Sequence, residues 1–141
     1  MNESIVEKAA LGWFEFLGYD TAKGADISPG SDSPLRASHE DMVLEPRLRA
    51  AMRKINDHLP EDAIEQAVRV ATRPPEPTLE QNNRWFHRLL TDGIDVEYRT
   101  KDGETRGDKA WLVDFSKPER NDLLVVNQFT VKCGNATRRP D

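Results

Sequence analysis

The stretch Leu123-Leu-Val-Val-Asn-Gln-Phe-Thr-Val131 is the longest β-rich run in this chain, and it decides the fold class. Its first half is continuously apolar, which is typical of a strand inside a sheet that is covered on both faces. Upstream, Val96 to Thr100 alternates polar and apolar residues, Asp102-Gly103 is a turn signal, and Ala110 to Phe115 is again β-rich. That pattern predicts a hairpin, so we expect the strands to lie within residues 94–132.

Helical patterns fill the chain before these strands. We predict a helix from Ser4 to Leu17, with Ser4 as N-cap, Glu7 in a capping box and Gly18 just beyond the end, buried on more than one side. Three further helical patterns follow, over 39–59, 61–71 and 78–93, after a long Gly-, Ser- and Pro-rich loop at 20–38.

Helices followed by strands predict an α+β (mixed α/β) fold, in which the N-terminal helices pack on a small mixed sheet. Periodicity also predicts which large apolar side chains form the core. They are Ile5, Trp13, Leu17, Leu48, Met52, Phe86, Leu89, Trp111, Val125 and Phe129.

Composition excludes several classes of protein. The 141 residues are enough for one domain, and 20 Lys+Arg against 25 Asp+Glu give a net charge of −5, which argues against tight nucleic-acid binding by the chain as a whole. Residues 47–54 hold four cations and no anion, and they form either a solvated helix face or a DNA-binding groove. With no long apolar run and no basic signal-like start, we expect a cytoplasmic protein without a membrane segment.

The chain carries few residues suited to catalysis. Cys133 is the only cysteine, and His39, His58 and His87 lack metal-ligand spacing, while nucleophile-elbow and phosphate-loop motifs are absent. The end, Arg138-Arg-Pro-Asp141, is either a solvated tail or half of a site for Mg²⁺ and phosphate. Carboxylate oxygen suits the hard cation, and arginine binds phosphate in bidentate fashion.

The whole chain resembles the N-terminal part of the restriction (R) subunit of type I restriction-modification enzymes. The likeness runs in order through six segments and covers nearly all positions. They are Val6–Tyr19, Val43–Ala51, Asn82–Gly93, Val96–Arg99 with Gly107-Asp108, Asn121–Val131 and Arg138–Asp141.

The resemblance implies an incomplete restriction-endonuclease-like fold of the PD-(D/E)xK type, in which Mg²⁺ activates water against a DNA phosphodiester. By that likeness Asp141 is the first catalytic, metal-binding carboxylate and Glu7 matches the helix glutamate of such sites, although capping alone also explains Glu7. Arg138 and Arg139 then contact DNA. The implied partners are double-stranded DNA and the modification and specificity subunits, and ATP belongs to a separate motor domain.

One departure from the family pattern affects activity. No lysine of the 141 residues has Asp or Glu two positions before it, so the Glu-x-Lys of such nucleases is absent. We therefore expect residues 1–141 to be the N-terminal portion of the nuclease domain of an enzyme that cleaves foreign unmethylated DNA, and to be inactive alone. The alternative is a non-catalytic interaction module that docks on the modification subunits.

Overall fold

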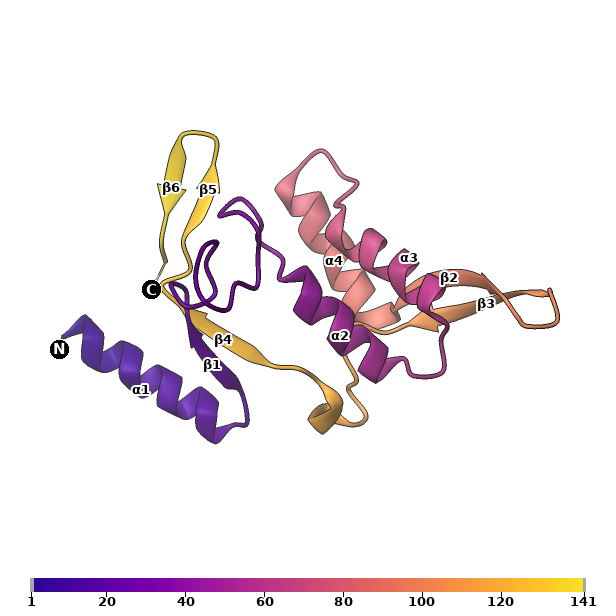
Figure 1. The fold of residues 1–141 in the computed structure, drawn as a ribbon, viewed down its shortest axis with the longest axis horizontal. Coiled ribbons are helices and arrows are strands. Elements are labelled where there is room, and N and C mark those ends of the chain that lie inside the picture. Colours follow the sequence, from indigo (N-terminus) through magenta and orange to yellow (C-terminus); the bar gives the residue numbers. More distant parts are fainter. Residues whose placement is uncertain (1, 141) are drawn as a thin grey trace. The chain divides into compact units, whose positions relative to one another are not determined.

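The computed structural model describes residues 2–140 and divides the chain into two compact units (Figure 1). The terminal unit consists of the chain up to Pro46 together with the chain from Asp122 onward, and the central unit spans Arg47–Asn121. Helices and strands occur in both units, so the predicted α+β class is confirmed. In the described part of the chain, no helix combines the length and apolar character that crossing a membrane requires.

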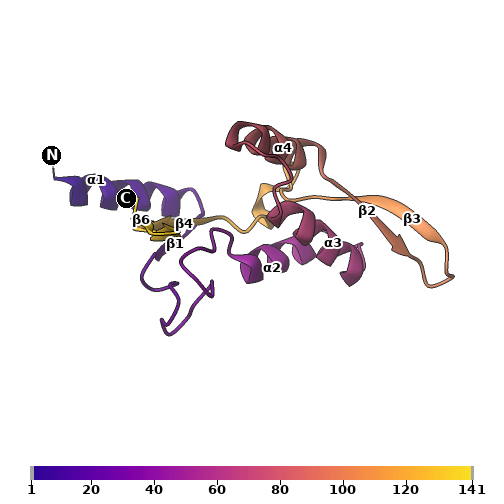
Figure 2. The ribbon, with the colours of Figure 1, turned by 90° about the horizontal axis from the view of Figure 1, so that it is seen from above.

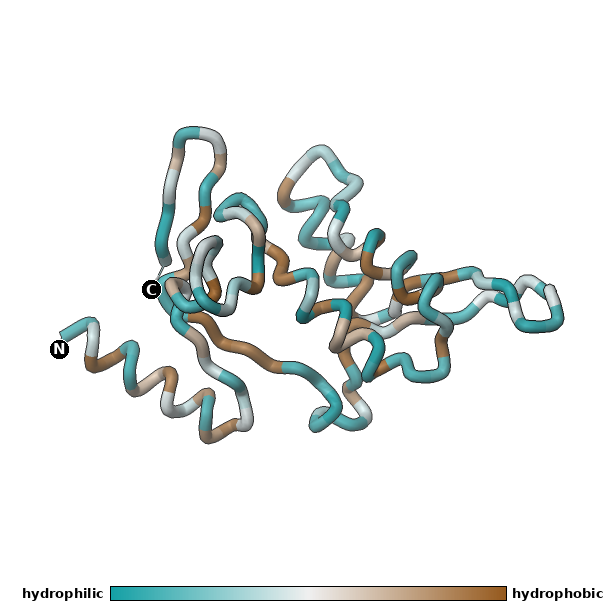
Figure 3. Tube along the Cα trace, viewed as in Figure 1, coloured by the Kyte–Doolittle hydropathy of each residue, from teal (hydrophilic) through white to brown (hydrophobic). Residues whose placement is uncertain are grey.

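The terminal unit is built on a parallel pair of strands. β1 (Asp20–Lys23) pairs with β4 (Leu124–Asn127) in a register that joins Asp20 to Leu124 and Lys23 to Asn127. Helix α1 (Glu3–Phe16) lies along one face of this pair (Figures 1 and 2). The apolar colour of β4 in Figure 3 marks the side chains that this packing half-buries.

Helix α1 begins and ends one residue earlier than predicted. Asn2, not Ser4, is the N-cap, because the Asn2 side chain accepts a hydrogen bond from the Ser4 backbone N–H at 3.3 Å. Gly18 follows the helix with φ +90°, as the predicted stop signal requires. With Asn2 as cap, Glu7 is beyond the third helical position, so the capping-box interpretation of Glu7 is wrong.

The prediction that α1 is buried on several sides is also wrong. Trp13 is 72% and Phe16 90% exposed, and the predicted core residues Ile5 and Leu17 are exposed as well. The apolar spacing does mark a helix, but a sheet of two strands is too narrow to cover more than one stripe of it. Periodicity identifies an apolar face without showing what covers that face.

The segment predicted as a loop at 20–38 begins with strand β1 instead. A four-residue strand of sequence Asp-Thr-Ala-Lys carries no apolar alternation, so pattern reasoning could not detect it. The remainder is an ordered loop held by buried Arg36, which donates to the Thr130 carbonyl at 2.6 Å and lies 3.8 Å from the centre of the Phe129 ring. Burial lowers the pKa of Arg36, and the charge of Asp41 opposes that shift.

The long strand predicted at 123–131 is broken in two. Gln128 adopts φ +56° and separates β4 from β5 (Val131–Cys133), which forms an antiparallel hairpin with β6 (Ala136–Arg138). The residues after the break, which were not predicted as a separate element, therefore form a hairpin. Val125 and Phe129, both predicted as core, are half-buried.

The central unit packs helices against a hairpin. It contains α2 (Glu45–Ile55) from Arg47 onward, α3 (Glu61–Thr72), α4 (Leu79–Asp92) and the 3₁₀ turn η1 (Pro118–Arg120). Strands β2 (Ile94–Arg99) and β3 (Thr105–Ala110) pair antiparallel and lie against α3. The hairpin prediction is confirmed, but its second strand ends at Ala110 instead of starting there. The helix predicted from about His39 begins at Glu45.

The fold contains three two-stranded sheets among the described residues, in place of the single small mixed sheet that we predicted. One is parallel and two are antiparallel. The sequence pattern locates some of the strand segments but does not specify which of them pair, because pairing depends on contacts between distant parts of the chain.

The cluster of buried apolar side chains belongs to the central unit. Of the predicted core residues there, Met52 is fully buried and Leu48 and Leu89 pack at its edge, whereas Phe86 and Trp111 are exposed. The buried apolar cluster is formed by α2, α3 and the hairpin. Its members are Met52, Leu59, Ala63, Ile64, Ala67, Val68, Ala71, Ile94, Val96 and Ala110.

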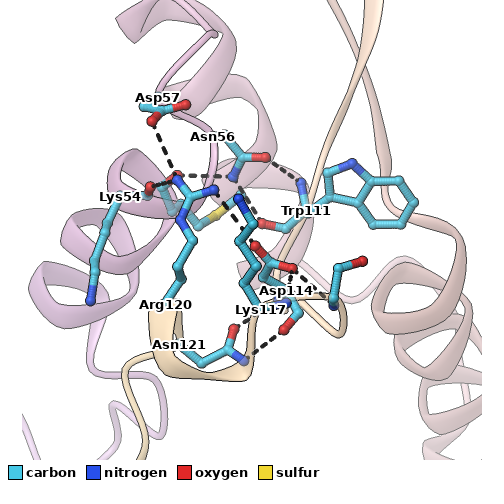
Figure 4. Close-up of polar contacts among 10 residues, drawn as sticks. Lys54, Asn56, Asp57, Trp111, Asp114, Lys117, Arg120 and Asn121 are labelled. Atoms are coloured by element: carbon cyan, nitrogen blue, oxygen red, sulfur yellow. Dashed lines mark hydrogen bonds and ion pairs between the residues drawn. The ribbon is translucent and has the colours of Figure 1, made fainter.

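A polar network fastens the segment after β3 to the end of α2 (Figure 4). The amide of Asn56, which is fully buried, accepts from the Trp111 backbone N–H at 2.7 Å and donates to the Trp111 carbonyl at 2.9 Å. Arg120 donates to the Lys54 carbonyl at 2.6 Å and approaches the Asp114 carboxylate at 3.6 Å. These bonds satisfy polar groups that would be costly to bury unpaired.

The core assignment predicts a contrast between two isoleucines. Ile64→Val in the central unit should lower the free energy of unfolding by about 0.5–1.5 kcal/mol, because Ile64 is 1% exposed. Ile5→Val on α1 should change it by less than about 0.5 kcal/mol, because Ile5 is 60% exposed. Urea unfolding of both variants measures the difference, and equal effects would contradict the assignment.

Candidate functional site

A pocket of about 570 Å³ opens in the terminal unit where the parallel strands β1 and β4 end. Its lining comes from α1, from the ends of both strands and from the segments that follow them. The residues are Glu7, Lys23, Ala25, Ser28, His39, Asn127, Gln128, Thr130 and Arg139. The carboxyl ends of parallel strands are the usual place for ligand sites in sheets of this kind.

Glu7 is the carboxylate of this pocket. The Asn127 amide donates to Glu7 Oε1 at 2.8 Å and the Gln128 amide donates to the same oxygen at 3.3 Å. Helix α1 thus presents Glu7 to the end of β4, with its side chain half-buried. Two amides fix the position of the carboxylate, and both hydrogen bonds use the same one of its two oxygens.

The backbone at Gly24 closely approaches the backbone at Gln128, beside Glu7. The Gly24 N–H donates to the Asn127 carbonyl at 2.8 Å, and a Cβ on Gly24 would lie 2.7 Å from the carbonyl carbon of Gln128. That spacing is closer than Cβ contacts occur in proteins, so only glycine fits there. Gln128 with its positive φ directs its side chain to Glu7 at the same point.

Cationic and titratable groups share the pocket with Glu7. Lys23 ends β1, His39 comes from the ordered loop, and Arg139 follows β6. Of the two arginines predicted to contact DNA, only Arg139 lines this pocket. Arg138 is exposed on β6 and donates to the carbonyl of its neighbour Thr137 at 3.2 Å. Arginine and lysine beside a carboxylate suit the binding of a phosphate group.

The oxygen ligands of the pocket supply part of the coordination that a hard cation needs. Within residues 2–140 no three His, Cys, Asp or Glu side chains lie close enough to hold a metal. Glu7 supplies one carboxylate, and the buried Oδ1 of Asn127 has no hydrogen-bond partner. Both are the oxygen ligands that Mg²⁺ prefers, but a second carboxylate is needed. The predicted metal ligand Asp141 lies outside the described residues.

Two of the four cations in the basic stretch of α2 pair with acids of α3. Arg49 donates to Glu65 at 2.5 and 3.2 Å, and Arg53 pairs with Glu61, so acids of α3 neutralise these cations. The hydrogen bond from Arg53 lowers the pKa of Glu61. Of the two alternatives for residues 47–54, the solvated helix face agrees with the structure.

Comparison with known proteins assigns the chain to a family. The model of the type I restriction enzyme R protein N terminus matches residues 1–141. The chain is 33% identical over its whole length to the type I restriction enzyme HindI endonuclease subunit of Haemophilus influenzae, and 30% identical to the putative type I restriction enzyme MjaIXP endonuclease subunit of Methanocaldococcus jannaschii. This chain belongs to the family of type I restriction enzyme R protein N termini. The predicted resemblance is therefore confirmed.

The R protein N terminus is a small part of these relatives. The chain spans 13% of the Haemophilus influenzae subunit and 14% of the Methanocaldococcus jannaschii subunit. No solved structure matches the chain. Both relatives are named as endonuclease subunits.

Three residues of the R protein N terminus that shape the pocket escaped sequence reasoning. The sequence pattern places Asn127 and Gln128 inside a strand over 123–131 and Gly24 in the long loop at 20–38. A signal was available, since two consecutive amide side chains interrupt an otherwise apolar run.

Proposed function

We propose that this chain provides the N-terminal part of the nuclease module in a type I R protein, with Glu7 and Asp141 as carboxylates of the cleavage site. The parent enzyme would hydrolyse phosphodiesters of foreign double-stranded DNA with Mg²⁺. A separate ATP-driven motor would supply translocation, and modification and specificity subunits would complete the enzyme. The single observation that carries the proposal is Glu7, held by two amides at the carboxyl ends of parallel strands.

Asp141 lies close in sequence to Arg139, which lines the pocket. Arg139 lines the pocket with Glu7, and Asp141 follows two residues later, a distance of at most about 7 Å along an extended chain. Mg²⁺ bound by these carboxylates and by Asn127 Oδ1 would activate water and stabilise the charge that develops on the leaving oxygen. Lys23 and Arg139 would bind the phosphate that is attacked.

The chain alone should not cleave DNA. Beyond the carboxylates of Glu7 and Asp141, nucleases of this kind need the carboxylate and the lysine of a Glu-x-Lys beside the attacking water, and that motif is absent from residues 1–141. We therefore expect no Mg²⁺-dependent conversion of supercoiled plasmid by the pure chain. Cleavage that Glu7→Gln abolishes would show that other residues complete the site.

Glu7→Gln in an intact R protein that begins with this chain tests the proposal directly. The amide keeps the size of the side chain but removes its charge, so we expect cleavage to fall by about 10²-fold or more while ATP hydrolysis and Tm stay unchanged. Glu15→Gln is the matched control, because Glu15 lies on the same helix and accepts a hydrogen bond from Thr21 of β1, outside the pocket. Equal cleavage by both variants would contradict a catalytic role for Glu7.

A second candidate function has its own observation. The exposed apolar face of α1, with Trp13, Phe16 and Leu17, supports a non-catalytic module that docks on the modification subunits. In that case Trp13→Ser with Phe16→Ser should abolish assembly with those subunits, and Glu7→Gln should leave cleavage by the assembled enzyme intact. Co-purification together with a plasmid assay separates the two candidates.

A further inference from the structure

A second pocket, of about 490 Å³, lies within the central unit between α3 and α4. Gln66, Arg69, Val70 and Arg73 of α3 and its C-cap line one side, and Pro75 and Trp85 complete the lining. The proposed nuclease chemistry uses none of these residues. Its volume lies within the range of small-molecule and cofactor sites.

Among residues 2–140, the two arginines of this pocket have no acidic partner. Arg69 and Arg73 lie four positions apart, on one face of α3 and at its end, and neither guanidinium makes an ion pair or a hydrogen bond with the described residues. By contrast, Arg49 of the same unit pairs with Glu65, and Arg84 pairs with Glu80. The charges at this pocket are therefore available to an anion from outside.

Trp85 and Gln66 add features that a bare anion site does not need. Trp85 is half-buried in α4 and contributes its indole to the pocket. Gln66 accepts a hydrogen bond from the Glu97 backbone N–H at 2.9 Å through its carbonyl oxygen, which fixes the side chain and leaves its NH₂ group as a donor. An indole, two guanidinium groups and an amide donor together match a base and its phosphates.

We propose that this pocket binds an unstacked nucleotide of single-stranded DNA, with the base against Trp85 and the flanking phosphates on Arg69 and Arg73. Any base can stack on an aromatic side chain, and arginines bind the phosphates whatever the base sequence. The site would hold a displaced or frayed strand. The proposal goes beyond cleavage and draws on the proposed function only for the choice of DNA over RNA.

Helix electrostatics alone offer a simpler account of the arginines. Arg69 lies in the last turn of α3 and Arg73 is its C-cap, where cations offset the partial negative charge of the helix end. That account requires neither the tryptophan nor the pocket, and it predicts no effect of Trp85 on any ligand. Binding measurements therefore distinguish the two accounts.

The experiment measures fluorescence anisotropy of a labelled oligothymidylate of about ten nucleotides with the 141-residue chain at several salt concentrations. Trp85→Leu keeps an apolar side chain but removes the stacking face, so we expect Kd to rise about 5- to 100-fold. The double variant Arg69→Gln/Arg73→Gln should bind with a weaker salt dependence. The slope of the logarithm of the association constant against the logarithm of the salt concentration should fall in magnitude by about 1.4, since each phosphate contact on a single strand contributes about 0.7.

Matched variants provide the controls. Trp13→Leu removes an exposed tryptophan of the terminal unit, and Arg84→Gln with Arg88→Gln removes two cations of α4 that do not line the pocket. Both control variants should bind like wild type.

Two results would overturn the proposal. One is equal weakening of binding by the test and control variants. The other is weakening by the arginine pair without an effect of Trp85→Leu, which would indicate a phosphate contact only. Because Arg69 and Arg73 are exposed, the arginine double variant should fold, and wild-type binding by it would overturn the proposal whether or not Trp85→Leu folds. Glu7→Gln should leave this binding unchanged, so the two proposals can fail separately.

Discussion

Asp141→Ala in an intact R protein that begins with this chain is expected to abolish DNA cleavage and to leave ATP hydrolysis near the wild-type rate. A metal carboxylate holds the ion that generates the nucleophile and stabilises the leaving oxygen, which is worth several kcal/mol in the transition state. Because each 1.36 kcal/mol is tenfold in rate, the expected loss is about 10³-fold or more. ATP hydrolysis should persist, since the proposed motor would bind ATP in a separate domain.

Plasmid linearisation and phosphate release from ATP, measured on the same preparation, check this prediction. Asp32→Ala is the control, because Asp32 is an exposed acid of the terminal unit that does not line the pocket at Glu7. Cleavage that survives Asp141→Ala would remove Asp141 from the proposed site. If Glu7→Gln alone abolished cleavage, Glu7 would remain as the carboxylate on which the site depends.

Local signals predicted the helices of this chain well. Thr78 caps α4 by accepting a hydrogen bond from the Gln81 backbone N–H, and Gly93 ends the helix with φ +74°, both as the sequence indicates. Such signals act within one turn of helix, so they are visible in the sequence alone. Burial is different, because it depends on what packs against a face. Trp13 and Phe16 carry a strong apolar pattern and are exposed, whereas Ala63 and Ala67 are fully buried.

Sequence reasoning identified a single residue of the candidate site but not the contacts that hold it in place. The resemblance selected Glu7, and the structure places Glu7 in a pocket with Arg139. The contacts that hold Glu7 join positions 120 and 121 residues apart in the chain, from Glu7 to Asn127 and Gln128. No local pattern encodes such a pairing. Parallel pairing of β1 with β4 brings these residues together, and β1 itself has no sequence signature.

Gly24→Ala is expected to destabilise the terminal unit by about 3 kcal/mol, near the upper end for overpacked sites. The added Cβ would meet the Gln128 carbonyl carbon at 2.7 Å and the Phe129 Cα at 3.0 Å, and backbone atoms cannot rotate away as a side chain would. The ends of β1 and β4 must then separate, which breaks the hydrogen bond from Gly24 to Asn127. Amide hydrogen exchange of β1 and β4 should accelerate accordingly.

Gly12→Ala supplies a control of opposite sign within the same unit. Gly12 lies in the interior of α1, and a Cβ there would meet nothing within 4 Å. Alanine should therefore raise the free energy of unfolding by about 0.5–1 kcal/mol through helix propensity. In an intact R protein, Gly24→Ala should also impair cleavage, because the displaced Asn127 and Gln128 no longer hold Glu7, whereas Gly12→Ala should not. If Gly24→Ala left both hydrogen exchange and cleavage unchanged, the close approach of β1 and β4 beside Glu7 would be wrong.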